Sequence, residues 1–493
     1  MLESETPSTV ENRRRWVALV VLCVGMLMIV LDATVVNVAL PAIQSDLGFS
    51  PSSLAWVVNA YLIAFGGLLL LAGRLGDLTS RRGVFLAGLA VFTGASLLCG
   101  LAQSQAVLIA ARFVQGVGGA MTSAVILGMI VTMFPEPRDR ARAIGVYSFV
   151  ASAGGSVGLL AGGVLTQGFN WHWIFFVNVP IGVATFAAAL RLLAPERGTG
   201  LRRGADVPGA VLITAALMLG VYTIVSPAAQ YGWTASRTLW LGAVSLLLLV
   251  SFIAREATAP NPLVPLRVFR SRVVSGANAV QALTVAGMFG MFFLGVLYLQ
   301  RVLHYDPLGT GLAFLPTTIV MGTLSLRYTE RLVTRFGAQR LVLPGLVLIA
   351  VGLALFARVP VHGDYLTDVL PSSLLIGTGV GVCFPALATL AMSGATDSDA
   401  GLASGLINTT TQVGAALGLA VLATLSATRQ ASLVRGGVPE ALGATGGYRL
   451  ALLVAAGLVV AAIAVAVPVL RASRTPEPEP ERELVTAGRA AAS

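Results

Sequence analysis

Lysine is absent from this chain of 493 residues, and all 32 of its basic residues are arginine. The sequence holds no Gly-Lys-Ser/Thr loop that could cradle a phosphate, so we expect no direct use of ATP. Charged residues are also scarce, at 11% of the chain, whereas 56% of the residues are hydrophobic. Soluble globular domains carry about 25% charged residues. The composition therefore excludes an ordinary soluble protein.

Cysteine and histidine occur at only three positions each. The cysteines, Cys23, Cys99 and Cys383, lie far apart and within apolar runs. They predict small buried side chains, and neither a disulfide framework nor a zinc site. The histidines are isolated from one another and show no metal-ligand spacing. We expect no metal, no cofactor and no enzymatic activity.

Long apolar runs are abundant instead. A helix needs about 20 predominantly apolar residues to cross a bilayer, and fourteen such runs predict an all-α integral membrane protein. An even number of spans puts both termini on one side of the membrane. The runs cover residues 17–37, 54–73, 84–102, 106–133, 142–165, 173–193, 207–226, 238–254, 273–299, 308–326, 341–357, 369–393, 402–427 and 449–470.

The distribution of the arginines predicts on which side of the membrane the two termini lie. If both termini are cytoplasmic, 25 of the 32 arginines lie in inner loops and tails, six lie outside, and Arg112 lies within a span. Because positive residues accumulate on the cytoplasmic side, we expect a multi-pass protein of the cytoplasmic membrane with both ends inside. The net charge of +10 then reflects anchoring to anionic lipid head groups, and we expect no nucleic-acid partner.

Asp32 interrupts the first apolar run, which continues beyond it to Leu40. A carboxylate at membrane depth costs about 2.5–3.5 kcal/mol even on a lenient insertion scale, and such residues mark ion or substrate paths. The alternative is an acid near the helix end that reaches out to water. We favour an embedded functional carboxylate because the residues that follow it are apolar.

Arg112 is predicted to lie at the same depth as Asp32. Asp32 is about 16 residues, roughly 24 Å, from the inner end of the first run, and Arg112 is about six residues, roughly 9 Å, from the outer end of the fourth. In a hydrocarbon core of about 30 Å these depths nearly coincide. We expect the two side chains to meet, directly or through water, so that protonation of Asp32 would release Arg112. The alternative role for Arg112 is a structural anchor bonded to backbone carbonyls.

Two glycine-rich runs indicate a duplication. Many glycines of the fifth and thirteenth runs are four residues apart, which leaves a bare strip where another helix can approach closely. Both runs are the fifth of six if the seventh and eighth are set aside as an insert, and two six-helix halves around a central site is a transporter plan. Close packing without a functional role is the alternative. The expected organisation is a cytoplasmic N-terminal segment, an N-terminal half, two inserted helices, a C-terminal half and a disordered cytoplasmic tail, at residues 1–16, 17–193, 207–254, 273–470 and 471–493.

A set of short motifs is spread over residues 15–470. Together they resemble the major facilitator superfamily and, within it, the fourteen-span drug:proton antiporters of the EmrB/QacA type. The resemblance implies the major facilitator fold with 14 transmembrane helices. The motifs are LDATVVNVALP at 31–41, GRLGD at 73–77 followed by Arg81-Arg82, RFVQGVGGA at 112–120, WHWIFFVNVPIG at 171–182, PLVPL at 262–266, GLAFLP at 311–316, GLASG at 401–405 and QVG at 412–414.

The resemblance also implies site residues. They are Asp32 and Arg112 for proton coupling, Arg74, Asp77, Arg81 and Arg82 for an inner gate that holds the two halves closed, and Gly154, Gly158, Gly162 and Gly163 for the antiporter helix. An alternative role for the gate residues is a positive-inside anchor with one solvated acid. The sequence departs from the family pattern at Leu159, where proline is usual and would kink the helix. It departs again at Leu78 and Ser80, where arginine and glycine are common.

Polar residues within the spans are candidates for the substrate cavity, because such groups face protein or water in preference to lipid. Hydrogen bonds between helices are an equal alternative for each. Asp206 and Asp368 lie at the edges of spans, so Asp32 is not joined by a second acidic residue deep within a span. We therefore expect that the substrates are not divalent cations. The cavity candidates are Asn37, Trp56, Asn59, Tyr61, Gln115, Asn278, Gln281, Phe292, Asn408 and Gln412.

These features predict a monomeric, proton-coupled exporter of amphipathic organic compounds such as drugs, antibiotics or secondary metabolites. Its expected partners are those compounds, protons and the lipid bilayer, and the proton motive force takes the place of a cofactor. An uptake carrier or uniporter of the same fold is one alternative, since fold does not decide the direction of transport. A transport-inactive sensor or scaffold is the other, and the embedded acid disfavours it.

Overall fold

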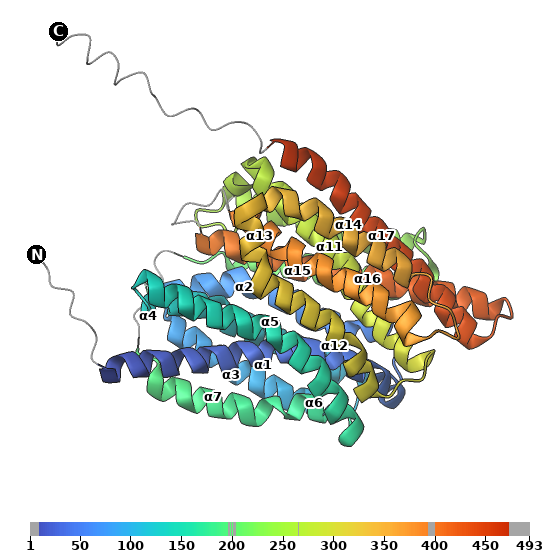
Figure 1. Cartoon of the computed structure of the whole chain (residues 1–493), viewed down its shortest axis with the longest axis horizontal. Helices are drawn as coiled ribbons and strands as arrows, with labels where there is room; N and C mark the ends of the chain where they lie inside the picture. The colour runs from blue at the N-terminus through green and yellow to red at the C-terminus, as the bar shows by residue number, and fades with distance from the viewer. Residues whose placement is uncertain are drawn as a thin grey trace, which may run out of the picture.

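Long helices lie side by side in the protein, whose structure is a computed structural model (Figure 1). It describes residues 9–195, 198, 200, 204–264, 266–392 and 400–472. The helix that begins the chain already starts at Thr9, inside the predicted N-terminal segment. The predicted disordered tail lies almost wholly outside the described residues. The first helix begins and the last helix ends at the same end of the bundle, which we call the terminal end; the opposite end is the distal end.

Every element in the described part of the chain is helical. The long helices are α1 (Thr9–Leu47), α2 (Trp56–Leu78), α3 (Arg81–Gly100), α4 (Gln105–Met133), α5 (Pro137–Gly168), α7 (Asn178–Leu192), α8 (Val207–Thr223), α10 (Ser236–Thr258), α11 (Arg272–Arg301), α12 (Pro307–Thr323), α14 (Ala338–Phe356), α15 (Leu370–Met392), α16 (Ala400–Arg435) and α17 (Glu440–Ala472). Short helices complete the chain: α6 (Trp173–Phe176), α9 (Ala229–Tyr231), α13 (Thr329–Phe336), the 3₁₀ turns η1 (Ser53–Ala55) and η4 (Leu266–Arg270), and the π turns η3 (Ile224–Ala228), η5 (Leu324–Tyr328) and η6 (Tyr365–Val369).

Each of the fourteen predicted runs falls on a helix. Among the described residues, twelve helical stretches are long and apolar enough to cross a membrane, with α6 and α7 forming one of them. The other two runs lie on α5, whose apolar part Val157–Gly168 is shorter, and on α12, which has 17 residues. The all-α membrane fold is therefore confirmed, whereas the count of fourteen spans stays a prediction.

The packing repeats between the two groups of helices on either side of α8 and α10. Helix α5 packs along α1 in the first group, and α16 packs along α11 in the second. The two groups also contact each other in an equivalent way. Helix α5 of the first group packs on α12 of the second, and α16 of the second group packs on α2 of the first. This reciprocal pattern is the one that a duplicated six-helix unit produces.

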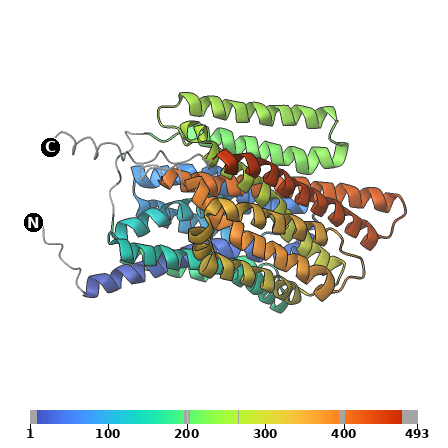
Figure 2. The ribbon, with the colours of Figure 1, turned by 45° about the horizontal axis from the view of Figure 1, so that its top comes forward.

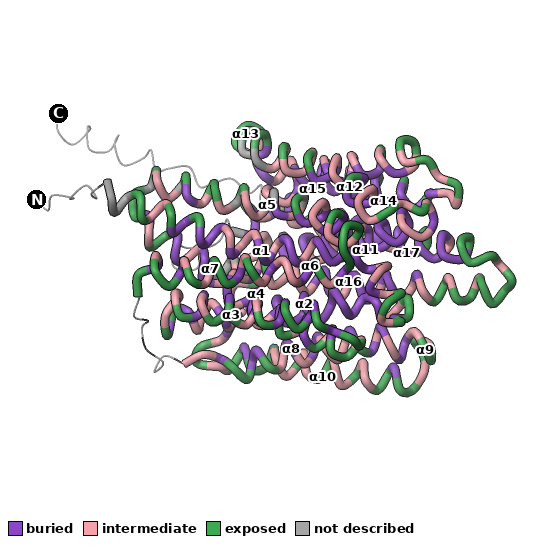
Figure 3. The backbone as a smooth tube through the Cα atoms, turned by 90° about the horizontal axis from the view of Figure 1, so that it is seen from below, coloured by how far each residue is buried: buried purple, intermediate pink, exposed green. Residues whose placement is uncertain are grey.

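Helices α8 and α10 form a pair on the outside of the bundle (Figure 2). The pair contacts the rest of the protein mainly through α8, which lies against α2 and α16. Only 6% of the most apolar 18-residue stretch of α10 is buried in the protein, and the tube view shows α10 largely exposed (Figure 3). An apolar helix with so little protein around it fits a position against lipid.

Several helices begin where the local sequence provides a cap. The side chains of Ser80, Ser104 and Ser271 each accept a hydrogen bond from the backbone N–H three residues further on. Asp306 caps α12 in the same way, and Pro307 follows it at the first helical position. Such caps satisfy N–H groups that have no partner within the helix, and proline suits that first position because it has no N–H.

Contacts between the two helix groups close the distal end. Gln300 on α11 donates its amide N–H to the carbonyl of Val38 on α1, at 2.9 Å. Gln167, near the end of α5, donates to Oδ2 of Asp306 at 3.1 Å and accepts from the backbone N–H of Leu308 at 3.2 Å. Among the described residues, these three hydrogen bonds join the two helix groups at this end.

Candidate functional site: a buried ion pair beside a cavity

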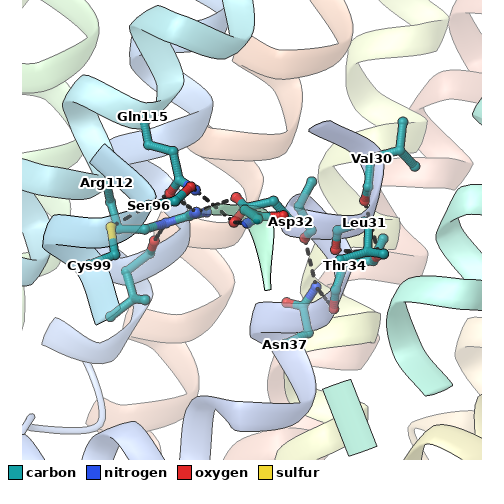
Figure 4. Close-up of polar contacts among 12 residues, drawn as sticks. Val30, Leu31, Asp32, Thr34, Asn37, Ser96, Cys99, Arg112 and Gln115 are labelled. Carbon is teal, nitrogen blue, oxygen red and sulfur yellow. Dashed lines mark hydrogen bonds and ion pairs between the residues drawn. The ribbon is translucent and has the colours of Figure 1, made fainter. Parts of the chain in front are cut away.

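Asp32 and Arg112 form a buried ion pair within the first group of helices (Figure 4). Nη1 of Arg112, on α4, donates to Oδ2 of Asp32, on α1, at 2.5 Å. Both side chains are 0% exposed. The direct contact agrees with the depths calculated from the sequence, whereas its role in proton coupling stays a prediction.

The carboxylate has further donors around it. Gln115 and Asn178 both donate their amide N–H groups to Oδ1 of Asp32, at 2.7 and 3.0 Å. The carbonyl of Gln115 accepts from Nη1 of Arg112 at 2.6 Å, and its amide also donates to the hydroxyl of Ser96 at 2.7 Å. Four helices, α1, α3, α4 and α7, thus contribute one polar cluster to an otherwise apolar region.

Arg112 has additional partners besides the acid. Its Nε donates to the backbone carbonyl of Val57 on α2 at 2.9 Å. Its guanidinium lies 4.5 Å from the ring centroid of Tyr61 and 5.7 Å from that of Phe175. Cation–π contacts are worth about 2 kcal/mol when desolvated. Arg112 therefore combines both roles that the sequence left open, an ion pair and a carbonyl anchor.

Changing the charge of this cluster has large consequences. Two opposite charges without water are stable together only when hydrogen bonds satisfy them, and removing one partner leaves the other buried and unpaired. Loss of the charge on either residue would therefore leave the other buried without its ionic partner.

A cavity of about 930 Å³ lies beside the ion pair. Its lining comes mainly from α1, α2 and α4, with further residues from α11, α16 and the connection that precedes α11. Thr34 and Tyr61 line it at mid-depth, and Arg74 and Asp77 line it at the terminal end. Tyr61 lies between the ion pair and the cavity. It lines the cavity, and the guanidinium of Arg112 lies over its ring.

Three of the predicted cavity residues line this space: Tyr61, Asn408 and Gln412. The other seven lie elsewhere. Gln115 belongs to the ion-pair cluster, and Gln281 donates to the hydroxyl of Thr411 on α16. Asn37 and Asn278 each donate to a backbone carbonyl of their own helix. Phe292 packs on Phe314. The last two, Trp56 and Asn59, are buried.

The gate residues gather at the terminal end of the first helix group. Arg81 pairs with Asp77 at 2.9 Å and also donates to the hydroxyl of Thr132 on α4 at 3.0 Å. Arg82 donates to the carbonyl of Leu190 on α7 at 2.7 Å. These bonds join helices within one group, and Arg74, Asp77 and Arg81 line the cavity mouth. A bond from these residues to the second group stays a prediction.

We expect Asp77→Asn to lower turnover several-fold without lowering the amount of inserted protein. The pair with Arg81 is partly exposed, with 48% of the Asp77 side chain accessible, and exposed pairs contribute only about 0–1 kcal/mol to stability. Its loss leaves Arg81 at the mouth of the cavity with its bond to Thr132 but without its acidic partner. Transport assays at matched protein levels measure the effect, and unchanged turnover would favour the simple anchor.

The four predicted glycines of α5 all lie against other helices. An added Cβ at Gly154 would meet Val30 of α1, and one at Gly162 would lie 2.7 Å from the carbonyl of Val35. A Cβ at Gly158 would overlap Thr34, and one at Gly163 would lie 2.8 Å from the carbonyl of Pro307 on α12. Helix α5 has no internal kink-forming proline and runs unbroken from Pro137 to Gly168, as expected from Leu159.

Comparison with known proteins identifies the family of this chain. The family model described as "Major Facilitator Superfamily" matches residues 22–419. The chain belongs to the major facilitator superfamily. This superfamily chain is 40% identical to the puromycin resistance protein of Streptomyces alboniger, over 90% of its own length and 89% of that protein's. It is 41% identical to a cephamycin export protein of Amycolatopsis lactamdurans, over 86% and 87% of the two chains.

Solved structures agree with this superfamily fold. A bacterial homologue of the human lysosomal transporter Spinster superposes with a TM-score of 0.69 at 17% identity, covering 94% of this chain and 99% of that one. A peptide transporter of the POT family gives a TM-score of 0.68 at 15% identity, covering 95% and 98%. At these identities the likeness shows the fold alone. Family and structure together make this a multi-pass membrane protein of a transporter family.

The sequence reasoning missed two members of the ion-pair cluster. Asn178 stands in the motif at 171–182, but nothing in its spacing relates it to Asp32, 146 residues earlier. Ser96 lies in an apolar run and reaches the cluster through Gln115. A signal for Asn178 did exist, because an amide inside a predicted span needs a partner there.

Proposed function

We propose that this protein exports amphipathic organic compounds across the cytoplasmic membrane in exchange for protons. The observation that carries the proposal is the Asp32–Arg112 ion pair, which is fully buried between helices long and apolar enough to cross a membrane and is separated by Tyr61 from a cavity of about 930 Å³. A buried acid with one strong partner is a natural site for a transported proton. The cavity beside it supplies room for an organic substrate.

Coupling requires that proton and substrate affect the same helices. Asp32 lies on α1 between Val30 and Thr34, which both line the cavity. Protonation of Asp32 weakens its hold on Arg112, and Arg112 contacts the Tyr61 ring and the carbonyl of Val57 on α2. A change in one proton therefore reaches two helices, α1 and α2, that form the cavity wall.

The energy of a proton limits what such an exchange can achieve. A membrane potential of about 150 mV supplies about 3.5 kcal/mol per charge, and half a pH unit adds about 0.7 kcal/mol. At about 1.4 kcal/mol for each factor of ten, one proton exchanged for one neutral molecule supports a gradient of about a thousandfold.

The cavity favours substrates with both apolar and polar parts. Phe65 and Phe289 offer apolar surface, whereas Asn408 and Gln412 offer amide groups. Charged side chains lie only at the mouth among the lining residues, so the inner part of the cavity suits a molecule without strong charge. The relatives named for puromycin resistance and cephamycin export support antibiotics as the substrate class.

Flux measurements in inside-out vesicles test this function. A panel of labelled antibiotics that includes puromycin and a cephamycin should accumulate inside the vesicles when a proton gradient is imposed. Collapse of the gradient with a protonophore should return the ratio to about one, since no other energy source remains. Flux that equilibrates regardless of the gradient would indicate a uniporter, and flux in the opposite direction an uptake carrier. No flux at all would favour a sensor.

Topology gives a second test. We propose that both termini are cytoplasmic, because 25 of the 32 arginines then lie inside. A reporter fused after Ser493 should behave as cytosolic. A reporter inserted into the connection between α16 and α17, at 436–439, should behave as external. The reverse pair of results would contradict this orientation and place the cavity mouth on the outer side.

A further inference from the structure

The connection between α10 and α11 forms part of the cavity wall. Residues 260–264, which we call the strap, begin two residues after α10 ends at Thr258. Four of the five strap residues line the cavity, and so does Arg267 just beyond them. The strap faces the same space as Arg74 and Asp77 of α2. A segment that belongs to neither six-helix group thus contributes to the space where we place the substrate.

The end of the strap is fixed in a hydrophobic cluster of its own. Leu263 and Val264 are 6% and 8% exposed and form a small core with Ala210 of α8 and Leu406 of α16. Partly buried side chains pack around this core, and those from α2 are Leu68, Leu70 and Leu71. The strap therefore docks across the seam between α2 of the first group and α16 of the second.

Glu256 holds the strap by a hydrogen bond to its backbone. This residue lies in the last turn of α10 and is only 3% exposed. Its Oε2 accepts from the N–H of Val264 at 2.8 Å, and its Oε1 has no hydrogen-bond partner within the described part of the chain. The neighbouring Arg255 pairs instead with Asp206, at 3.1 Å.

This position is unfavourable for an acid in two ways. A negative charge near the C-terminus of a helix opposes the helix dipole, and a buried carboxylate needs hydrogen bonds to offset its lost hydration. Ion pairing does not explain Glu256, since the adjacent arginine is bonded to Asp206. The backbone of the strap bonds to its carboxylate instead, through Val264 at 2.8 Å and with a further contribution from Leu263.

The chemistry of the strap differs from that of the helices opposite. Pro260 and Pro262 have no backbone N–H and present rigid ring faces. Asn261 stands between them, exposed, with a side-chain amide that can both donate and accept. Such a wall suits a molecule with a flat or ring-shaped apolar part and a hydrogen-bonding group at its edge.

We propose that the strap is a substrate-contacting element that determines specificity, and that Glu256 is its positioning residue. The proposal rests on the proposed function, because the molecule it contacts is the exported compound. Glu256 acts through Val264 and does not itself touch the substrate. Asn261 is the strap residue that contacts the polar group of the substrate.

Substrate protection tests the contact. Asn261→Cys places a thiol at the cavity wall of a protein whose own three cysteines are all buried. A water-soluble maleimide added to inside-out vesicles should modify Cys at this position, and the best-transported antibiotic of the panel should slow that reaction. Thr258→Cys is the matched control, since Thr258 is exposed on α10 but does not line the cavity. Equal rates with and without antibiotic at position 261 would overturn the contact.

Transport kinetics test the positioning role. We expect Glu256→Ala to raise KM by about tenfold or more with little change in kcat, which is the size of effect expected when a hydrogen bond to a charged group is lost. Glu256→Gln should stay near wild type, because its amide oxygen can accept from Val264. Asn261→Ala should change the order of preference among the antibiotics.

A control variant separates positioning from general stability. Arg255→Gln breaks the ion pair with Asp206 but leaves the bond from Glu256 to Val264 in place. It should keep the wild-type KM and order of preference. Equal KM values for wild type and Glu256→Ala would overturn the proposal while leaving the exporter intact. Absence of transport by the wild-type chain would overturn the proposed function, and the strap's role with it.

Discussion

Asp32→Asn is expected to abolish accumulation of substrate against a gradient. Asparagine keeps the size of aspartate and can still accept from Gln115 and Asn178, but it does not titrate between pH 5 and 8. No proton can then be exchanged for substrate at this position. The wild-type protein should reach gradients of up to about a thousandfold, whereas the variant should reach a ratio of about one.

The loss must be separated from a folding defect. From the sequence alone, neutralising a carboxylate in the membrane would ease insertion. The structure corrects this expectation, because Asp32 pairs with Arg112, and removing one partner of a buried pair costs about 3–5 kcal/mol. The double variant Asp32→Asn with Arg112→Gln removes both charges together. It should insert better than the single variant and should still fail to accumulate substrate.

Two measurements decide the role of Asp32. Exchange of labelled for unlabelled substrate, measured without a proton gradient, should persist in any variant that folds and binds. Accumulation driven by a proton gradient should be lost in both asparagine variants and partly kept in Asp32→Glu. Wild-type accumulation by Asp32→Asn would show that another group carries the proton, and the coupling mechanism proposed here would fail.

The Asp32–Arg112 pair is the part of the site that the sequence predicted best. Depth along a helix follows from counting residues at a rise of about 1.5 Å each, and the two counts agreed. Rotation about the helix axis does not follow in the same way. Asn278 and Gln281 share one face of α11, but that face meets α16, where Gln281 bonds to Thr411. The sequence could not reveal this, because the angle at which a helix turns toward its neighbours is set by tertiary packing.

Glu256 shows a second limit of the sequence. The sequence was searched for acidic residues only within the apolar runs. Glu256 lies two residues beyond the end of the eighth run, which covers residues 238–254. It is buried because the strap folds back over it and places Val264 on its carboxylate. Burial of this kind depends on a loop conformation and leaves no periodic pattern in the sequence.

Gly163→Val is expected to prevent closure of the distal end. Gly163 on α5 lies against the backbone of α12, and an added Cβ would be 2.8 Å from both the Pro307 carbonyl and the Cα of Leu308. Backbone atoms cannot rotate away as a flexible side chain can, so the helices must separate. Overpacking of this kind costs about 1–3 kcal/mol. Because the clash exists only while the distal end is closed, that free energy shifts the equilibrium toward a form that is open there by about 5- to 150-fold.

Labelling from either side of the membrane measures this shift. Ala33→Cys places a thiol on the cavity lining at mid-depth. In the otherwise unchanged protein it should react with a maleimide supplied at the terminal end, where the cavity opens. In the Gly163→Val background it should react instead with a maleimide supplied at the distal end. Transport should be lost, because we propose that export requires the cavity to open at the two ends in turn.

Gly145→Val provides the matched control for this change. Gly145 lies on the same helix, and an added Cβ there meets nothing within 4 Å. The cost of valine within a helix is therefore the same at both positions, while the clash with α12 occurs only at 163. Transport should survive Gly145→Val. If Gly163→Val left both transport and the labelling side unchanged, the contact between α5 and α12 would be close packing without a part in the transport cycle.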